Sequence, residues 1–381
     1  MLKCYKSDFP IFQTLPDLVY LDSANTTHKP YSVLESMMQF YSSSYASPHR
    51  GDYRLAYDAS LYYQEARNTV KSFINAREAS EVIFTHGATH SINLVAHGLR
   101  QHFKGGDKII LSKWEHSSNL LPWKLLAEEL ALELIYVNDW QELPKLLSGR
   151  VRLIACNHYS HTTGERAPVE YITKLALVYR TLVLVDGTQA VAHTPIDVLA
   201  LGCDFFVFSG HKLYAPNGVG VLYIKDPYRQ VIKISEVGGG QVEDLDLTIT
   251  ARYPDCMEAG TPNLPAIIGL KHAIDYLTNL GGMCYIKTYT ALLRDYAVTR
   301  MKEMYLPLYY GEGPVISIQM PEPYDVACIL GAKNICVRSG YLCNHLLKVG
   351  PLLRVSFGIY NSTQDIDIFI QSLKQVRKLC I

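Results

Sequence analysis

The chain has 381 residues, of which 48% are hydrophobic and 19% are charged, a balance typical of folded globular proteins and unlike that of disordered chains. Its 36 basic and 36 acidic residues cancel, so no net charge favours nucleic acid or an anionic membrane surface. The nine scattered cysteines include no C-x-x-C pair for zinc or dithiol chemistry, which fits a reducing compartment and predicts no metal site.

The N-terminal residues mix lysine and aspartate without a following apolar run, so we expect no secretory signal. No stretch of about 18 apolar residues predicts a membrane span. A cytoplasmic protein is therefore expected, and its length predicts two or three domains.

Strand and helix patterns alternate through the first two thirds of the chain. Strands are predicted at residues 19–22, 81–85, 108–111, 132–137, 151–156, 182–185, 205–208 and 218–224. Helices are predicted at residues 30–41, 55–75, 88–99, 119–130 and 169–179. This alternation predicts an α/β fold, with a mostly parallel sheet covered by helices on both faces.

The pattern changes after the glycines at residues 238–240. A loop-like stretch reaches Pro265, and two helices, two strands and a final helix are then predicted at residues 266–277, 285–302, 315–319, 353–357 and from 365 onward. We expect an N-terminal segment (1–25) packing with the small domain, a large domain (26–255) and a smaller α+β C-terminal domain (256–381).

Three turns that directly follow predicted strands carry polar residues. They are Gly87-Ala88-Thr89, Asp186-Gly187-Thr188-Gln189 and Ser209-Gly210-His211-Lys212. Ligands of open α/β sheets bind beyond the carboxyl ends of the strands, so we expect these turns to meet in one site. A pyridoxal phosphate (PLP) site needs a lysine for a Schiff base, a carboxylate for the pyridinium nitrogen and donors for the phosphate, and these turns supply all three.

Simpler interpretations exist for each residue alone. Asp186 could be a turn or helix-cap aspartate, and Lys212 could be a solvated surface lysine. Their joint occurrence after two strands favours the cofactor site. Because a free lysine titrates near pH ~10.4, we expect burial or a neighbouring positive charge to lower the pKa of Lys212.

The chain resembles the class V aminotransferase family of fold-type I PLP enzymes, in particular its cysteine desulfurase and selenocysteine lyase branch, and it is group II-like within that branch. The resemblance covers nearly the whole chain. The matching stretches are Leu21-Asp22-Ser23-Ala24, His49-Arg50-Gly51, Ile92-Asn93-Leu94-Val95-Ala96, Glu115-His116 with Asn119 and Pro122-Trp123, Val185-Asp186-Gly187 with Gln189-Ala190, Phe208-Ser209-Gly210-His211-Lys212, and Glu258-Ala259-Gly260-Thr261-Pro262-Asn263.

The resemblance implies a role for each matched residue of the cofactor site. Lys212 would form the Schiff base with PLP, and Asp186 would pair with the pyridinium nitrogen. Gln189 would bond the phenolic oxygen, and His116 would stack on the ring and carry protons. The phosphate end would be held by Ala88, Thr89, Ser209 and His211, together with Thr261 from the neighbouring subunit of a homodimer.

Substrate-binding residues are implied in the same way. Arg354 lies where the family has the arginine that binds the substrate carboxylate, a task suited to a planar bidentate donor. Arg338 lies where the family has a second active-site arginine, and Asn25 is assigned to the substrate as well. As alternatives, His116 could be a satisfied interior residue and Arg354 could serve an internal salt bridge.

Cys343 aligns with the sulfur-accepting cysteine of the family. Its thiolate would take the sulfur of L-cysteine, leaving a persulfide on the enzyme and releasing L-alanine. A cysteine is more commonly a small buried hydrophobe, but a glycine-containing loop such as the one before Cys343 can present a reactive thiol. The resemblance further implies L-selenocysteine as a related substrate and a sulfur-acceptor protein as a partner.

Several positions depart from the family pattern. Tyr341 and Leu342 stand where the group II branch usually has two histidines, and the sequence after Cys343 differs too. His161 replaces the asparagine that faces the cofactor ring, and His90 replaces an acidic residue. Because imidazole titrates near neutral pH, we expect His161, as a cofactor-site residue, to alter proton transfer.

Two alternatives to the desulfurase remain open. One is another outcome of the same chemistry, such as carbon–sulfur lysis, selenocysteine lysis or an epimerase-type reaction, in which Cys343 would be dispensable. The other is a non-catalytic scaffold of the same fold, against which the presence of both Lys212 and Asp186 speaks.

Overall fold

The computed structural model describes residues 4–48, 51–242, 246, 248–344, 346 and 349–380. His49 and Arg50, which belong to a matching stretch, and His345, which follows Cys343, lie outside the described residues.

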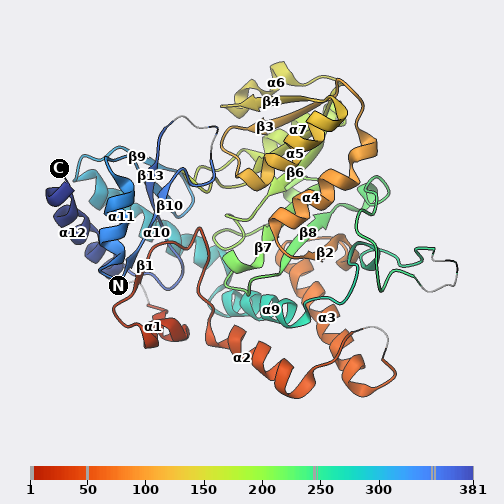
Figure 1. Ribbon diagram of the computed structural model, residues 1–381, viewed down its shortest axis with the longest axis horizontal. Helices are drawn as coiled ribbons and strands as arrows, with labels where there is room; N and C mark the ends of the chain where they lie inside the picture. Colours follow the sequence, from red (N-terminus) through yellow and green to blue (C-terminus); the bar gives the residue numbers. More distant parts are fainter. Residues whose placement is uncertain are drawn as a thin grey trace.

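A seven-stranded sheet forms the centre of the larger part of the molecule, on the right in Figure 1. Its strand order is β2-β8-β7-β6-β5-β3-β4; the run from β7 to β4 is parallel, and β8 is antiparallel to both of its neighbours. The strands are β2 (Val82–Thr85), β3 (Lys108–Ser112), β4 (Glu133–Val137), β5 (Val151–Asn157), β6 (Leu182–Asp186), β7 (Phe205–Ser209) and β8 (Gly220–Ile224). The predicted mostly parallel α/β sheet is confirmed.

Helices cover both faces of this sheet. They are α3 (Arg54–Phe73), α4 (Ala88–Gly98), α5 (Leu121–Leu130), α6 (Leu143–Leu146), α7 (Val169–Tyr179) and α8 (Val198–Leu201). In β6, Leu182 and Leu184 join the apolar cluster that contains α4 and α5, whereas Val183 and Val185 join the cluster that contains α7. The uninterrupted apolar run of β6 is therefore explained by burial on two sides.

A second sheet, in the blue part of Figure 1, lies near the C-terminus. It is antiparallel, in the order β12-β13-β10-β9, with β9 (Leu308–Tyr310), β10 (Val315–Ile318), β12 (Arg338–Gly340) and β13 (Leu352–Ser356). The helices α10 (Gly282–Lys302) and α11 (Pro323–Gly331) pack on this sheet, and α12 (Thr363–Cys380) packs on both helices.

The two parts of the molecule are joined through several segments. The strand β1 (Val19–Tyr20) pairs in parallel with β11 (Ile335–Cys336), which ties the N-terminal segment to the C-terminal part. The helix α9 (Leu264–Asn279) follows the expected boundary at residue 256, yet it packs on α2 (Tyr31–Gln39) and α3. The three-part division of the chain stays a prediction.

The sequence patterns missed seven helices and strands, namely α1 (Pro10–Thr14), α6, α8, α11, β9, β11 and β12. Three of them are strands of two or three residues, which are too short to show a periodic pattern. None of the helices within the described ranges is long and apolar enough to cross a membrane.

Candidate active site

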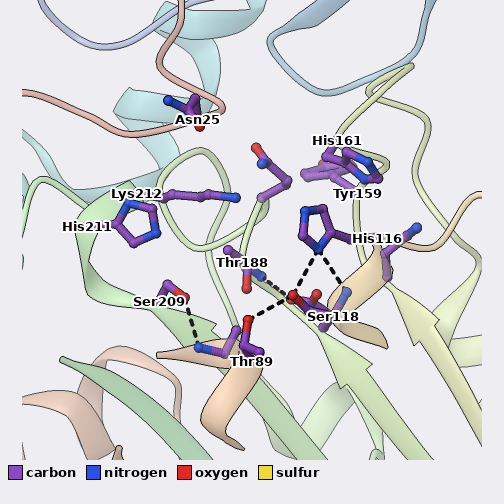
Figure 2. Close-up of a pocket in the computed structure, with 14 residues that line it drawn as sticks. Asn25, Thr89, His116, Ser118, Tyr159, His161, Thr188, Ser209, His211 and Lys212 are labelled. Atoms are coloured by element: carbon purple, nitrogen blue, oxygen red, sulfur yellow. Dashed lines mark hydrogen bonds between the residues drawn. The ribbon is translucent and has the colours of Figure 1, made fainter. Parts of the chain in front are cut away.

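A pocket of about 220 Å³ opens at the carboxyl ends of β5, β6 and β7, and Figure 2 shows its lining. All three turns that the sequence singled out contribute to it. The lining residues are Asn25, Ala88, Thr89, His116, Ser118, Asn157, Tyr159, His161, Asp186, Thr188, Gln189, Ser209, His211 and Lys212. Ten of the expected site residues are thus brought together, whereas Thr261, Arg338, Cys343 and Arg354 do not line this pocket.

Asp186 and Lys212 enter the pocket from the ends of adjacent strands. Asp186 is the last residue of β6, and its Oδ1 accepts a hydrogen bond from Thr188 N at 2.9 Å, which fixes the carboxylate. Lys212 ends the short 3₁₀ turn Gly210–Lys212 after β7, and its side chain extends toward the middle of the pocket in Figure 2.

The environment of Lys212 favours a neutral amine. Burial lowers the pKa of Lys212 to about 8, an effect that the nearby Asp186 carboxylate partly opposes and that Arg354 reinforces. In the part of the chain that the structure describes, no hydrogen bond or salt bridge engages its Nζ. The amine is therefore buried, loses its proton more readily than a free lysine does, and is available to a ligand.

The start of α4 forms another wall of the pocket. Ala88 N donates to Ser209 Oγ at 2.8 Å, which joins this helix end to the end of β7. A Cβ atom on Gly220 would lie 2.4 Å from Gly87 Cα, so only glycine lets β8 pass this close to the turn. Because α4 has eleven residues, its N-terminus carries the partial positive charge that suits an anionic group.

Further hydroxyl and imidazole groups lie near the N-terminal end of α4. Thr89 Oγ1 and Ser118 Oγ are 2.8 Å apart, and His211 Nδ1 and Thr26 Oγ1 are 3.1 Å apart. Burial lowers the pKa of His211 to about 4, and the charge of Lys212 adds to this effect.

His116 is held as a neutral imidazole with a defined tautomer. Its Nδ1 accepts a hydrogen bond from Ser118 N at 3.1 Å, which leaves the proton on Nε2. Burial lowers the pKa of His116 to about 4, with the charge of Lys212 as the next cause. The ring is therefore uncharged near pH 7.

The His161 ring meets the His116 ring edge to face, with centroids 4.9 Å apart. His161 Nε2 donates to Leu342 O at 2.7 Å, so this nitrogen carries the proton. Burial lowers the pKa of His161 well below its ordinary value, and His116 and Arg354 add to the effect. The expectation that His161 titrates near neutral pH is wrong, because a charged imidazole would lose its hydration in this buried position and would be repelled by the nearby Arg354.

Arg338 and Arg354 share one carboxylate, that of Asp22. Arg338 Nη2 lies 2.9 Å from Asp22 Oδ2, and Arg354 Nη2 lies 3.1 Å from Oδ1. The two arginines are register partners on β12 and β13. Arg354 Nη1 also donates to His161 O at 3.0 Å, but its buried Nε has no hydrogen-bond partner among the described residues. The internal salt bridge that was an alternative for Arg354 is therefore present, and one donor of Arg354 is left over.

Cys343 and Thr261 lie in loops outside the pocket lining. Cys343 is exposed, and its carbonyl oxygen accepts hydrogen bonds from Ser117 N at 3.2 Å and Ser117 Oγ at 2.9 Å. Thr261 is exposed before α9 and lines a different cavity, together with residues such as His90 and Glu258.

The donors and acceptors of the pocket fit PLP. Lys212 provides an amine, Asp186 provides a carboxylate and the α4 end provides backbone amides at an anion-binding position. Thr188 Oγ1 is buried at the pocket without a hydrogen-bond partner in the described chain. Such an orphan group is rare in a folded protein, and a bound ligand would satisfy it.

Sequence reasoning missed several contributors to the site. Three of them, Ser118, Asn157 and Tyr159, line the pocket; Thr188 lies in a turn that the sequence singled out, but it was given no role there. Asn157 ends β5, the parallel neighbour of β6, so the rule that ligands bind beyond strand ends could have found it. The role of Asp22 as the common partner of two arginines had no comparable signal, although Asp22 belongs to a matching stretch.

Comparison with known proteins assigns the chain to a family. The aminotransferase class-V family model matches residues 19–369. A cysteine desulfurase of Yersinia pseudotuberculosis serotype O:1b (strain IP 31758) is 36% identical over 400 residues, with 98% of each chain covered. Two solved cysteine desulfurases are similar throughout: the apo form from Thermococcus onnurineus NA1 (TM-score 0.94, 32% identity, 99% of both chains) and CsdA (S-sulfonic acid) from Escherichia coli (TM-score 0.91, 31% identity, 99% of this chain and 98% of that one). As its motifs predicted, the chain belongs to the aminotransferase class-V family.

Proposed function

We propose that this protein is a PLP-dependent cysteine desulfurase, which converts L-cysteine to L-alanine and carries the removed sulfur as a persulfide on Cys343. The observation that supports this most is the pocket in which Lys212, Asp186 and a neutral His116 meet. The two structures and the curated relative named above are all cysteine desulfurases.

The cofactor would be held by side chains from several strand ends. When bound, PLP supplies an aldehyde that condenses with amines and a ring that withdraws electrons from the substrate. Lys212 would bind the aldehyde, Asp186 would pair with the ring nitrogen and Gln189 would reach the phenolic oxygen. The phosphate would lie against Ala88, Thr89, Ser209 and His211, at the positive end of α4.

Lys212 and His116 would move protons during the reaction. Lys212, with its pKa lowered to about 8 by burial, is partly unprotonated at pH 7.5 and would take the proton from the substrate Cα. His116 has a proton on Nε2 and could donate it, or accept one after releasing it. Arg354 would bind the substrate carboxylate through its unpartnered Nε, and Asn25 would contact the substrate from the pocket lining.

Cys343 would accept the sulfur. Its thiol first loses a proton, and the thiolate then attacks the substrate sulfur. A sulfur–sulfur bond forms, the carbon–sulfur bond breaks, and its electron pair stays with the substrate carbon. That carbon then takes a proton, so that L-alanine and an enzyme persulfide are the products; the persulfide would pass to an acceptor protein.

The active enzyme would be a homodimer, with Thr261 reaching the phosphate of the neighbouring subunit. This proposal is supported by large apolar side chains that α2, α3 and the turn between them expose, which a second copy would cover. They are Leu34 (42% exposed), Met38 (67%), Tyr41 (59%), Leu55 (44%), Tyr57 (64%) and Leu61 (41%).

One observation favours a second candidate, carbon–sulfur lysis without a persulfide. Cys343 is exposed and does not line the pocket, and the residues beside it differ from the family pattern. In that reaction L-cysteine would yield pyruvate, ammonia and sulfide, and Cys343 would be dispensable.

The test is to give the PLP-loaded enzyme L-cysteine with a thiol reductant and to measure alanine, pyruvate and sulfide. We expect alanine and sulfide in equal amounts, with little pyruvate. Pyruvate as the main product would contradict the desulfurase and select carbon–sulfur lysis. A protein that binds no PLP and yields neither product would instead be the scaffold.

A further inference from the structure

The loop that carries Cys343 is attached to the large part of the molecule at two successive carbonyl groups. Leu342 O accepts a hydrogen bond from His161 Nε2 at 2.7 Å. Cys343 O accepts from Ser117 N at 3.2 Å and from Ser117 Oγ at 2.9 Å. The donors belong to segments that line the pocket or adjoin its lining, so these bonds join the loop to the pocket wall.

The backbone of this loop needs such support. Leu342 and Cys343 both have left-handed conformations, with φ of +55° and +58°, which side chains other than glycine rarely adopt. Conformations of this kind persist where surrounding contacts hold them. Within the loop, Asn344 N donates to Tyr341 O at 2.9 Å and closes the turn around these two residues.

His161 is well placed to supply one of these contacts. Its side chain is buried, with the residue only 4% exposed, so water does not compete for Nε2. Its ring packs edge to face with His116, and its carbonyl oxygen accepts a hydrogen bond from Arg354 Nη1 at 3.0 Å. Both the backbone and the ring of His161 are thus held by contacts other than its hydrogen bond to the loop.

We propose that His161 is a positioning residue for sulfur transfer: its Nε2–H holds the Leu342 carbonyl and thereby keeps the left-handed turn that presents Cys343 to the pocket. The inference rests on the proposed function, since positioning Cys343 matters only if Cys343 accepts sulfur. An asparagine at this position, as in the family pattern, has a shorter side chain and would not reach Leu342 in the same backbone arrangement. In this chain the longer imidazole therefore connects the cofactor pocket to the nucleophile loop.

The first test follows hydrogen exchange of the backbone amides at residues 338–344 in the PLP-loaded protein. In His161→Asn we expect exchange there to rise about five- to tenfold, the change that loss of one hydrogen bond produces, with the rest of the chain unchanged. His97→Asn, at an exposed position of α4, is the matched control and should behave as wild type. Unchanged exchange at residues 338–344 in His161→Asn would overturn the proposal.

If His161→Asn loosens the whole chain, His161→Gln decides, because its longer amide retains a donor that can reach Leu342. Protection at residues 338–344 close to that of wild type supports the proposal, and loss of that protection overturns it.

The second test is kinetic. Alanine formation by His161→Asn should lose about five- to tenfold in kcat with little change in KM or in the visible absorbance of the bound cofactor. A wild-type kcat would contradict the positioning role. Failure of the wild-type enzyme to form a persulfide would instead remove the proposed function, and the exchange measurement would still decide whether His161 holds the loop.

Discussion

The pocket wall, meaning the strand ends that carry Asp186 and Lys212, and the loop that carries Cys343 are held in place in different ways. Asp186 and Lys212 stand at or just beyond the ends of β6 and β7, whose residues are all buried in the core of the large sheet. Cys343 lies between β12 and β13, in a left-handed turn whose carbonyl oxygens accept hydrogen bonds from side chains of other segments. Core packing thus holds the proposed cofactor-binding residues, whereas a few hydrogen bonds hold the turn with Cys343, the proposed sulfur acceptor.

This difference suggests that substitutions can impair the function of the pocket wall and that of the Cys343 loop separately. Damage to the wall should remove the cofactor and every reaction that depends on it. Damage to the loop should leave the cofactor bound and impair sulfur transfer alone.

The largest effect is expected for Lys212→Ala. Without its amine the wall cannot bind the cofactor covalently, so alanine formation should fall at least about 10³-fold and the visible absorbance of the Schiff base should vanish. Absorbance spectra and alanine assays check this, with Lys174→Ala, on the exposed side of α7, as the control. A Lys212→Ala enzyme with wild-type absorbance would place the covalent site elsewhere.

Cys343→Ser should impair sulfur transfer and leave the cofactor bound. Alanine formation should fall about 10²-fold or more because a hydroxyl is a poor sulfur acceptor, whereas the cofactor absorbance should stay as in wild type. Cys284→Ser, at another exposed cysteine, should retain full activity. Equal activities of the two variants would show that Cys343 is not the acceptor.

Glu115→Gln should lower the stability of the large part of the molecule next to the pocket wall. Glu115 is fully buried, and the two oxygens of its carboxyl group accept hydrogen bonds from Asn157 N and Asn119 Nδ2, both at 2.8 Å. Burial raises the pKa of Glu115 to about 8, and these two hydrogen bonds oppose the rise.

A glutamine at this position would turn an NH₂ group toward one of those donors, so we expect the free energy of unfolding to fall by about 2 kcal/mol. Urea unfolding measures this change, and Glu128→Gln on the exposed side of α5 should have almost no effect. An equal, small effect of both substitutions would show that the Glu115 network does not support the wall.

A smaller effect concerns the pH dependence of stability and two buried histidines, of which His158 adjoins the pocket residue Asn157. His158 N donates to Asp186 O, and burial lowers the pKa of His158 to about 4 and that of His193 to about 3. Below pH 6.5 the two imidazoles bind protons in the unfolded chain but stay unprotonated in the folded one. The free energy of unfolding that is present above pH 6.5 is therefore lost as the pH falls toward 4.

When the pH is lowered from 7.5 to 5.5, each of these two histidines should lower the free energy of unfolding by about 1.4 kcal/mol. Urea unfolding of the cofactor-free protein at both pH values tests this, and His158→Gln should flatten the dependence. A stability that does not change between these pH values would contradict neutral burial of both rings.

The sequence predicted the wall better than the loop, for a physical reason. The apolar run of β6 and the polar turn after it are local signals, and the parallel topology that brings Asp186 near Lys212 follows from alternating strands and helices. The pairing of Arg338 and Arg354 through Asp22 joins three separate segments, and no local pattern encodes it.

His161 shows the same limit more sharply. Its residue type favours titration near neutral pH, but burial beside His116 and Arg354 keeps it neutral and its Nε2 holds Leu342. Such properties depend on neighbours that only the folded chain brings together.

The most direct test of this account locates the sulfur after a single turnover. PLP-loaded enzyme is mixed with L-cysteine without reductant, and its peptides are weighed by mass spectrometry while free alanine is quantified. The account predicts one added sulfur atom on the peptide containing Cys343 for each alanine released. Alanine release with the sulfur on another cysteine, or with no sulfur on the protein, would contradict it.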